Sequence, residues 1–287
     1  MGRIVFLVLI AGMLAISCSE NYKVNISEDQ DEGQECFRIE LENATLYYQK
    51  GAGGFSSIVD KEGNDWLGFR KDTIQGYPDN AASEYRGLPN LVFRSEDSGA
   101  GHPGSDQCHS NQSAPNQIRT ESQSGKWAWT WTFHADHAVM HVEKTDPGHS
   151  YWFLYEGIPG GRYQPQYQYW GTDQGGPNEQ IPDYYFNNAV YDTWQWAYFG
   201  HRAVHRVFYI VHHQDDDLTD TFSYLGNTED GVISPDGMVV FGFGRDRDAE
   251  TLLKDPGQIF TFGFYEKAIL TNQDHEDLGK MIRRHIK

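Results

Sequence analysis

Short stretches in which apolar and polar residues alternate follow one another along most of the chain. The clearest is Trp127–Phe133, where aromatic side chains occupy every second position and therefore share one face of a strand. A tight turn over His134–His137 leads into a second alternating stretch, Ala138–Glu143, so this region predicts a β-hairpin. Clusters of Gly, Asn, Asp and Pro separate the stretches, which is typical of an all-β protein.

Strands that follow one another without intervening helices favour antiparallel sheets packed face to face. Helical patterns occur only around Ala249–Lys254 and over Asp274–Ile286, where acidic residues come first and basic residues last, as the helix dipole prefers. The predicted fold is a large antiparallel β-sandwich with long loops and a short C-terminal helix, formed by residues 37–287 as a single catalytic domain. Further strands are predicted at residues 37–41, 44–48, 54–59, 151–155, 203–212, 237–243 and 259–264.

The N-terminal segment has the pattern of a lipoprotein export signal. In residues 1–17, the basic Arg3 precedes a short apolar run, and small residues stand just before Cys18. Residues 18–36 are polar and acidic, so they predict a flexible tether. We therefore expect an exported protein, anchored to the cell envelope in the periplasm or at the outer-membrane surface by lipid on Cys18. An ordinary secretory signal would change only the anchoring.

The formal net charge of −18 at pH 7 is strongly negative, and the chain has no basic patch of the kind that neutralises phosphates. Nucleic acid is therefore excluded as a partner, and the membrane is expected as a partner only through the lipid. A local group of Arg and His can still hold the carboxylates of an acidic sugar inside a negative protein. Cys36 and Cys108 are either a disulfide in an oxidising compartment or two unpaired thiols.

The chain contains no nucleophile elbow, phosphate-binding loop, dinucleotide fingerprint or His-Glu-x-x-His motif. Candidate chemistry lies instead in polar clusters beside the predicted strands. Arg86, Asn90 and His102 could come together at one sheet edge, where Arg86 and Asn90 suit a carboxylate and a sugar hydroxyl. His102, held between Gly and Pro, suits a general base, or else it is incidental to a rigid turn. Glu156 ends a strand and is the carboxylate expected to face a ligand, although it could instead bond only to loop amides.

Residues 199–213 combine histidines, arginines and a tyrosine on or beside one predicted strand. Alternation places His205 and Tyr209 on one face, and Arg206 and His212 on the other. Either pair could donate and accept protons beside a substrate, or form a polar ladder satisfied across strands.

The long loop 157–191 is rich in Tyr and Trp and also in Gly, Gln and Asn. Flat rings suit the apolar faces of sugars, and amides suit their hydroxyls, so Arg162 and Trp170 are candidate substrate-binding residues. The alternative is that these aromatic residues only cover the sheet.

No metal or cofactor is expected for catalysis. A structural calcium ion at Asp215–Asp217, or another divalent ion between His134 and His137, is an alternative to solvent-exposed turns. His137 and His141 cannot share an ion, because strand residues four apart are separated by about 13 Å.

Residues 48–66, 156–161 and 236–245 resemble the large β-sandwiches of galactose-mutarotase type that occur in carbohydrate-active enzymes, including polysaccharide lyases. The resemblance implies a saccharide on a concave sheet face and, in the lyase branch, a β-elimination. That reaction needs a group that neutralises a uronate carboxylate, a base that removes the C5 proton and an acid that protonates the leaving oxygen. The candidates are, in that order, Arg86, Asn90 or Arg206; His102, His205 or His212; and Tyr209.

The favoured hypothesis is therefore a lyase or dehydratase that acts on uronate-containing oligosaccharides or polysaccharides. A glycoside hydrolase or sugar epimerase on the same fold is an alternative, and a hydrolase would need two facing carboxylates. A surface lipoprotein that binds glycans without turnover is the remaining alternative.

Overall fold

The computed structural model describes residues 23–71, 82–180, 189–227 and 233–286. The predicted signal segment, residues 1–17, and Cys18 lie outside the described residues. Within the described part of the chain, no helix is long and apolar enough to cross a membrane.

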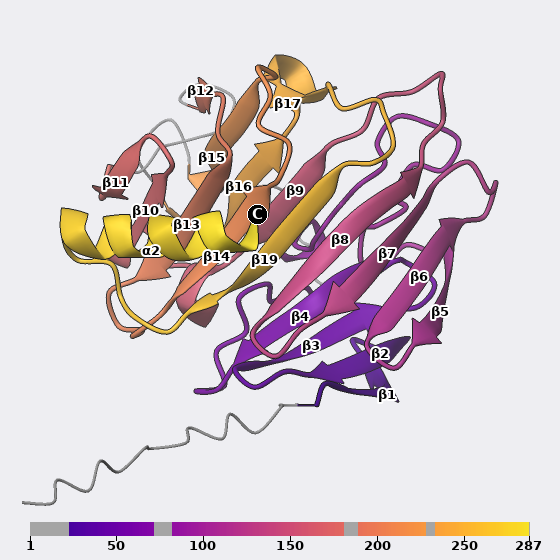
Figure 1. Cartoon of the computed structure of the whole chain (residues 1–287), viewed down its shortest axis with the longest axis horizontal. Coiled ribbons are helices and arrows are strands. Elements are labelled where there is room, and N and C mark those ends of the chain that lie inside the picture. The colour runs from indigo at the N-terminus through magenta and orange to yellow at the C-terminus, as the bar shows by residue number, and fades with distance from the viewer. Residues whose placement is uncertain (1–22, 72–81, 181–188, 228–232, 287) are drawn as a thin grey trace, which may run out of the picture.

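One layer of the molecule is a nine-stranded antiparallel sheet (Figure 1). Its strands, in spatial order, are β11 (Gly175–Asn178), β10 (Gln168–Thr172), β13 (Trp196–His201), β14 (Val207–His212), β19 (Ile259–Tyr265), β8 (His137–Lys144), β7 (Ala128–Phe133), β6 (Gln117–Ser122) and β5 (Cys108–Ala114).

The second layer consists of two four-stranded antiparallel sheets, and both pack against the large sheet. Phe55 of the first small sheet lies 5.0 Å from Trp131, and Phe153 of the second stacks on Phe260 at 4.3 Å, both measured between ring centroids. The predicted β-sandwich is thus confirmed. The strands of the first sheet are β1 (Asn25–Asp31), β2 (Gln34–Glu40), β3 (Ala44–Gln49) and β4 (Gly54–Asp60); those of the second, in spatial order, are β12 (Val190–Asp192), β15 (Asp220–Asn227), β16 (Ile233–Phe243) and β9 (Phe153–Gly157).

The aromatic alternation in β7 lies at the centre of the core. Trp127, Trp129, Trp131 and Phe133 are all 0% exposed. The hairpin that follows closes with a hydrogen bond of 2.9 Å from the main-chain N–H of His134 to the carbonyl oxygen of His137. Both the strand face and the hairpin predicted from the sequence are confirmed.

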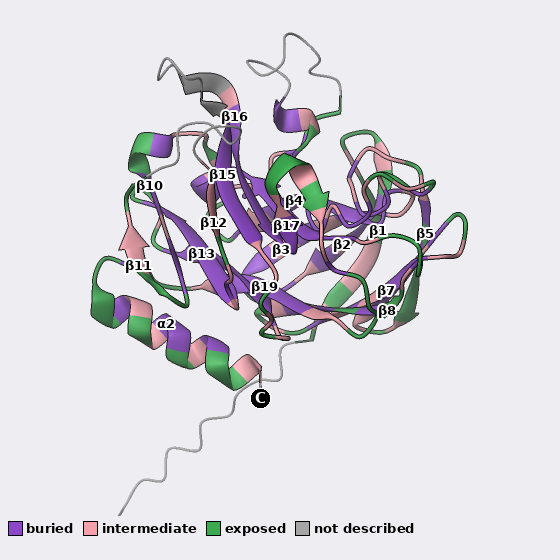
Figure 2. Ribbon diagram, turned by 90° about the horizontal axis from the view of Figure 1, so that it is seen from above, coloured by how far each residue is buried: buried purple, intermediate pink, exposed green. Residues whose placement is uncertain are grey.

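The terminal helix α2 (Asn272–His285) is also confirmed. The Thr271 hydroxyl accepts a hydrogen bond from the main-chain N–H of Asp274, whose carboxylate accepts one in return from that of Thr271, so a capping box starts the helix. Leu278 and Ile282 are fully buried against the outer face of the large sheet, while the opposite side of the helix is exposed (Figure 2).

Several expectations about secondary structure were wrong. The predicted loop 157–191 contains the strands β10 and β11 and the start of β12. Residues 25–36 do not belong to a flexible tether, because β1 and β2 pair along their whole length and Ile26 packs against the core. Residues 249–254 do not form a helix: Asp248 and Ala249 have φ values of 57° and 56°, and a short strand, β18 (Glu250–Thr251), follows and pairs with β17 (Arg245–Asp246). The pattern of hydrophobic positions along the chain does not indicate a polar edge hairpin or a left-handed turn.

Cys36 and Cys108 are both buried and are free thiols. Burial is the main cause that raises the pKa of each thiol to about 12. Of the two possibilities left open by the sequence, the structure shows the unpaired thiols.

We expect Leu278→Ala to lower the free energy of unfolding by about 2–5 kcal/mol, because it leaves a cavity between α2 and the large sheet. Leu270→Ala is the matched control, since Leu270 is 67% exposed and its loss should change stability by less than about 0.5 kcal/mol. Urea unfolding of both variants measures the difference, and equal stabilities would show that α2 is not part of the cooperative core.

Candidate active site

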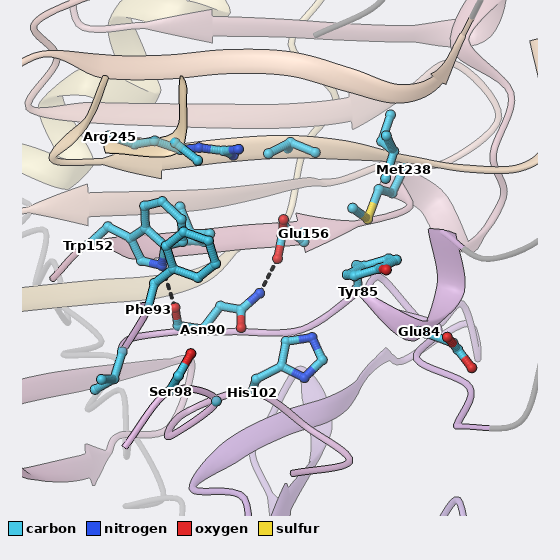
Figure 3. Close-up of a pocket in the computed structure, with 16 residues that line it drawn as sticks. Glu84, Tyr85, Asn90, Phe93, Ser98, His102, Trp152, Glu156, Met238 and Arg245 are labelled. Atoms are coloured by element: carbon cyan, nitrogen blue, oxygen red, sulfur yellow. Dashed lines mark hydrogen bonds between the residues drawn. The ribbon is translucent and has the colours of Figure 1, made fainter. Parts of the chain in front are cut away.

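A pocket of about 470 Å³ lies on the outer face of the small sheet that contains β15, β16 and β9 (Figure 3). Its volume is within the range of roughly 300–1,000 Å³ that is typical of small-molecule sites. The lining combines an apolar floor with converging polar groups. The polar and charged lining residues are Glu84, Tyr85, Asn90, Ser98, His102, Glu156 and Arg245, and the large apolar ones are Val92, Phe93, Trp152, Leu154, Leu225, Met238 and Val240.

The floor results from the alternation of side chains along β9 and β16. Tyr155 and Phe241 are paired across the two strands and lie in the core. Glu156 and Val240, the next pair, therefore lie on the opposite face and line the pocket. The fold thus places a carboxyl group on an otherwise apolar surface.

Glu156 is buried and accepts a hydrogen bond from the side-chain amide of Asn90 (Figure 3). Burial raises the pKa of the Glu156 carboxyl to about 7, although the charge of Arg245 and the Asn90 hydrogen bond act in the opposite direction. Near neutral pH this carboxyl group therefore exists in both protonation states, as a group that donates or accepts a proton requires.

The segment around Asn90 runs antiparallel beside β9. Gly87 and Glu156 exchange main-chain hydrogen bonds of 2.8 and 3.0 Å, and the N–H of Leu154 donates to the carbonyl oxygen of Pro89 at 2.7 Å. Because of this pairing, Asn90 and Glu156, which the sequence suggested as separate candidates, belong to one site.

His102 enters the pocket from the next turn. The main-chain N–H of Asn90 donates to the carbonyl oxygen of Gly101 at 3.0 Å, and Figure 3 shows Asn90 between His102 and Glu156. Gly101 has a φ of +89°, and a Cβ there would lie only 2.8 Å from the main-chain nitrogen of Leu91, so glycine is required for this approach.

Burial lowers the pKa of His102, and hydrogen bonds to the main chain of Pro103 and Tyr85 partly offset this effect. The imidazole is therefore neutral at pH 7, which is the form that accepts a proton.

The remaining wall carries a positive charge. The guanidinium carbon of Arg245 lies 5.1 Å from the centre of the Trp152 ring, and Trp152 stacks on Phe93 at 4.6 Å. Arg245 is buried and its charge acts on Glu156, so the pocket contains a cation beside the carboxyl group.

Arg86 is buried outside the pocket lining. Its guanidinium donates to the Asp236 carboxylate at 2.6 Å and to the carbonyl oxygens of Gly237 at 2.8 Å and Gly68 at 2.9 Å. These bonds join the segment that precedes Asn90 to β16. Arg86 therefore bonds to protein groups that support the site, and it does not line the pocket.

The predicted cluster on β14 is not part of the pocket. The strand begins at Val207 and not at residue 203, so of the four predicted residues only Tyr209 and His212 lie on it. Both faces of the strand are covered: Tyr209 packs beneath α2, and His212 packs on Phe260 at 4.7 Å between ring centroids. Burial also raises the pKa of the Tyr209 phenol and lowers that of His212. His205 is exposed just before the strand.

Arg206 is a buried partner of acidic side chains on the surface. Its guanidinium lies 2.6 Å from the Glu62 carboxylate and 3.3 Å from that of Glu266. Arg162 is exposed, and Trp170 packs on Phe222 while its indole N–H donates to the carbonyl oxygen of Gln180 at 2.9 Å. None of these predicted residues lines the pocket.

Among the described residues, no group of three or more His, Cys, Asp or Glu side chains could hold a metal ion. The rings of His134 and His137 stack face to face at 4.4 Å, and the Asp216 carboxylate accepts a hydrogen bond from the main-chain N–H of Leu218 at 3.0 Å. Neither the Asp215–Asp217 turn nor the His134–His137 pair belongs to such a group among the described residues.

Sequence reasoning missed Tyr85, Trp152 and Arg245 as pocket residues. Trp152 lies at the start of a predicted strand, and Arg245 ends the segment 236–245 that carries the family resemblance. The sequence therefore contained a signal for each of these two residues. Tyr85 directly precedes the Arg86–Asn90 cluster and was recognisable only by proximity.

Comparison with known proteins identifies the fold. No protein-family model and no curated protein matches the chain. A galactose mutarotase-like protein from Lactobacillus casei ATCC 334 is similar in structure, with a TM-score of 0.52 and 12% identity over 80% of this chain and 100% of that chain. A putative aldose 1-epimerase from Klebsiella pneumoniae subsp. pneumoniae MGH 78578 has a TM-score of 0.51 and 11% identity over 90% of this chain and 87% of that chain. The protein therefore has a galactose-mutarotase-like fold, as its sequence predicted.

We expect Glu156→Gln to be more stable than the wild type at pH 8 and about equally stable at pH 4. The pKa of this carboxyl is raised in the folded state, so its contribution to stability is complete below pH 4.5 and is lost as the pH rises through about 7. The expected difference at pH 8 is about 3 kcal/mol. Denaturant unfolding at both pH values tests this, and a wild type that is the more stable protein at pH 8 would contradict it.

Proposed function

We propose that this protein is an enzyme that transfers protons on a saccharide bound in the pocket, and that its reaction is a β-elimination on a uronate-containing sugar. One observation carries the proposal: a neutral imidazole, a titratable carboxyl with its amide partner, and a guanidinium converge on one cavity. The galactose-mutarotase-like fold supports a saccharide as the ligand.

In this proposal His102 removes the proton on C5. Arg245 and the Asn90–Glu156 pair bind the uronate carboxylate, on which negative charge develops as the C5–H bond breaks. The electron pair of that bond forms the C4–C5 double bond, and the C4–O bond breaks. The Tyr85 phenol, also in the pocket, protonates the leaving oxygen; the group released is a sugar in a lyase and water in a dehydratase.

A second candidate is an aldose 1-epimerase, and the specific observation in its favour is the Glu156 carboxyl with a pKa of about 7. In ring opening, one group removes the proton of the C1 hydroxyl while another protonates the ring oxygen, and reclosure reverses both transfers. A carboxyl group close to half ionised serves either step. The similar Klebsiella protein is described as a putative aldose 1-epimerase, which also favours this candidate.

The test is to incubate the protein with uronate-containing oligosaccharides and to follow ultraviolet absorbance and product mass together. Elimination gives a rise in absorbance from the unsaturated uronate, with loss of water in the case of a dehydratase. We expect His102→Gln to lower kcat about 10²–10⁴-fold, because it removes the base. His205→Gln is the matched control and should leave kcat unchanged, since His205 is exposed and does not line the pocket.

Other outcomes separate the alternatives. Addition of water to the product would indicate a hydrolase. Exchange between anomers by NMR, without a change of mass, would indicate the epimerase. Binding of a saccharide with neither result would leave a glycan-binding protein, and equal kcat values for the two histidine variants would exclude His102 as the base.

We also propose that the protein is exported and carries lipid on Cys18, because the pattern of residues 1–18 favours a lipoprotein signal. Metabolic labelling with a fatty acid should label the wild type and not Cys18→Ser. Cys36→Ser is the control, since that thiol is buried and should not affect labelling. Label that persists in Cys18→Ser would contradict the anchor.

A further inference from the structure

Asn90 makes three separate contacts that connect the parts of the pocket. Its main-chain N–H donates to the carbonyl oxygen of Gly101 at 3.0 Å, immediately before His102, and its side-chain amide donates to Glu156. Its own carbonyl oxygen accepts a hydrogen bond of 2.6 Å from the indole N–H of Trp152. The position of this one residue therefore affects both the Glu156 carboxyl and the turn that holds His102.

The backbone of Asn90 has a φ of 53°, in the left-handed region. Asparagine adopts this conformation more readily than most residues, but the conformation still costs free energy and persists only where surrounding contacts hold it. The indole N–H of Trp152 is one such contact, and it acts directly on the carbonyl group of the Asn90 peptide.

Trp152 is well placed to hold its neighbours because it is itself immobilised. The side chain is 4% exposed, its ring stacks on Phe93 at 4.6 Å, and the guanidinium carbon of Arg245 lies 5.1 Å from the ring centre. One rigid indole thus contacts both the residue that bonds to Glu156 and the cation of the pocket.

We infer that Trp152 is a positioning residue of the site: its N–H orients Asn90, and through Asn90 the Glu156 carboxyl, while its ring orients Arg245. The inference rests on the proposed function only in naming the site as catalytic. Trp152 does not itself exchange a proton with the substrate.

The test is Trp152→Phe, which retains an aromatic ring and removes the N–H. With Asn90 less well held, its hydrogen bond to Glu156 weakens, and this bond is one of the causes that lower the pKa of that carboxyl. The pKa of Glu156 should therefore rise, by about one pH unit if the bond is lost. The measurement is a pH titration of the Glu156 side-chain carbon by ¹³C NMR, with the resonance assigned from Glu156→Gln.

Trp127→Phe is the matched control. Trp127 is 0% exposed, and within the described residues its indole nitrogen has no hydrogen-bond partner, so the substitution removes no bond. Its titration of Glu156 should be the same as in the wild type. In the Asn90→Ala background, Trp152→Phe should cause no further shift of the Glu156 pKa, because the connecting amide is already absent and phenylalanine retains a ring beside Arg245.

A Glu156 titration in Trp152→Phe that coincides with the wild type overturns the inference, whatever the change in stability. Trp152→Tyr also lacks the indole N–H and provides the same test if the phenylalanine variant does not fold.

The titration needs no substrate, so an upward shift in a protein that turns over no sugar would support the positioning role and reject the proposed function. In an active enzyme, the limb of the pH–rate profile that depends on Glu156 should move upward by the same amount.

Discussion

The pocket depends on the two-residue period of the β-strand, because β9 and β16 each present one face to the core and the other to the cavity. Tyr155 and Phe241 pack among the aromatic residues of the sandwich, and this packing directs Glu156 away from the core. A shift of register by one residue would exchange the two faces and bury the carboxyl in the apolar interior. The chemistry of the site is therefore tied to the packing of the sandwich.

The other pocket groups are attached to this strand by main-chain hydrogen bonds. The segment from Gly87 to Leu91 pairs with the edge of β9, and the turn that holds His102 bonds in turn to Asn90. Main-chain pairing of this kind holds the loops that carry Asn90 and His102 beside β9, and it thereby positions the functional side chains. Phe93 and Trp152 complete the wall that holds Arg245.

Electrostatics inside the pocket differ from those of the protein as a whole. The chain has a formal net charge of −18, yet the cavity contains a buried guanidinium, a neutral imidazole and a carboxyl with a pKa near 7. Burial dominates over the overall charge because removal of water penalises each ionised form locally. The global acidity therefore says little about the charge of a ligand in this site.

Predictions made from local sequence patterns were wrong where the structure depends on turns. The hairpin of β1 and β2 turns at Glu32 and Gly33, both with positive φ, and its outer strand is largely polar, so its sequence is similar to that of a tether. The segment near Ala249 has helix-forming residues, but the left-handed turn at Asp248 and the pairing of β17 with β18 override that preference.

By itself the sequence determined several core strands, the buried aromatic face of β7 and the terminal helix, because these follow from local periodicity and composition. Its motifs also carried the resemblance to a galactose-mutarotase fold. It also indicated Asn90 and His102 at one sheet edge, and Glu156 apart from them. Only the tertiary structure decided that these residues share a pocket and that Tyr209 and His212 do not. The physical reason is that periodicity separates the two faces of a strand but does not show what covers each face: on β14, α2 covers one and the core covers the other.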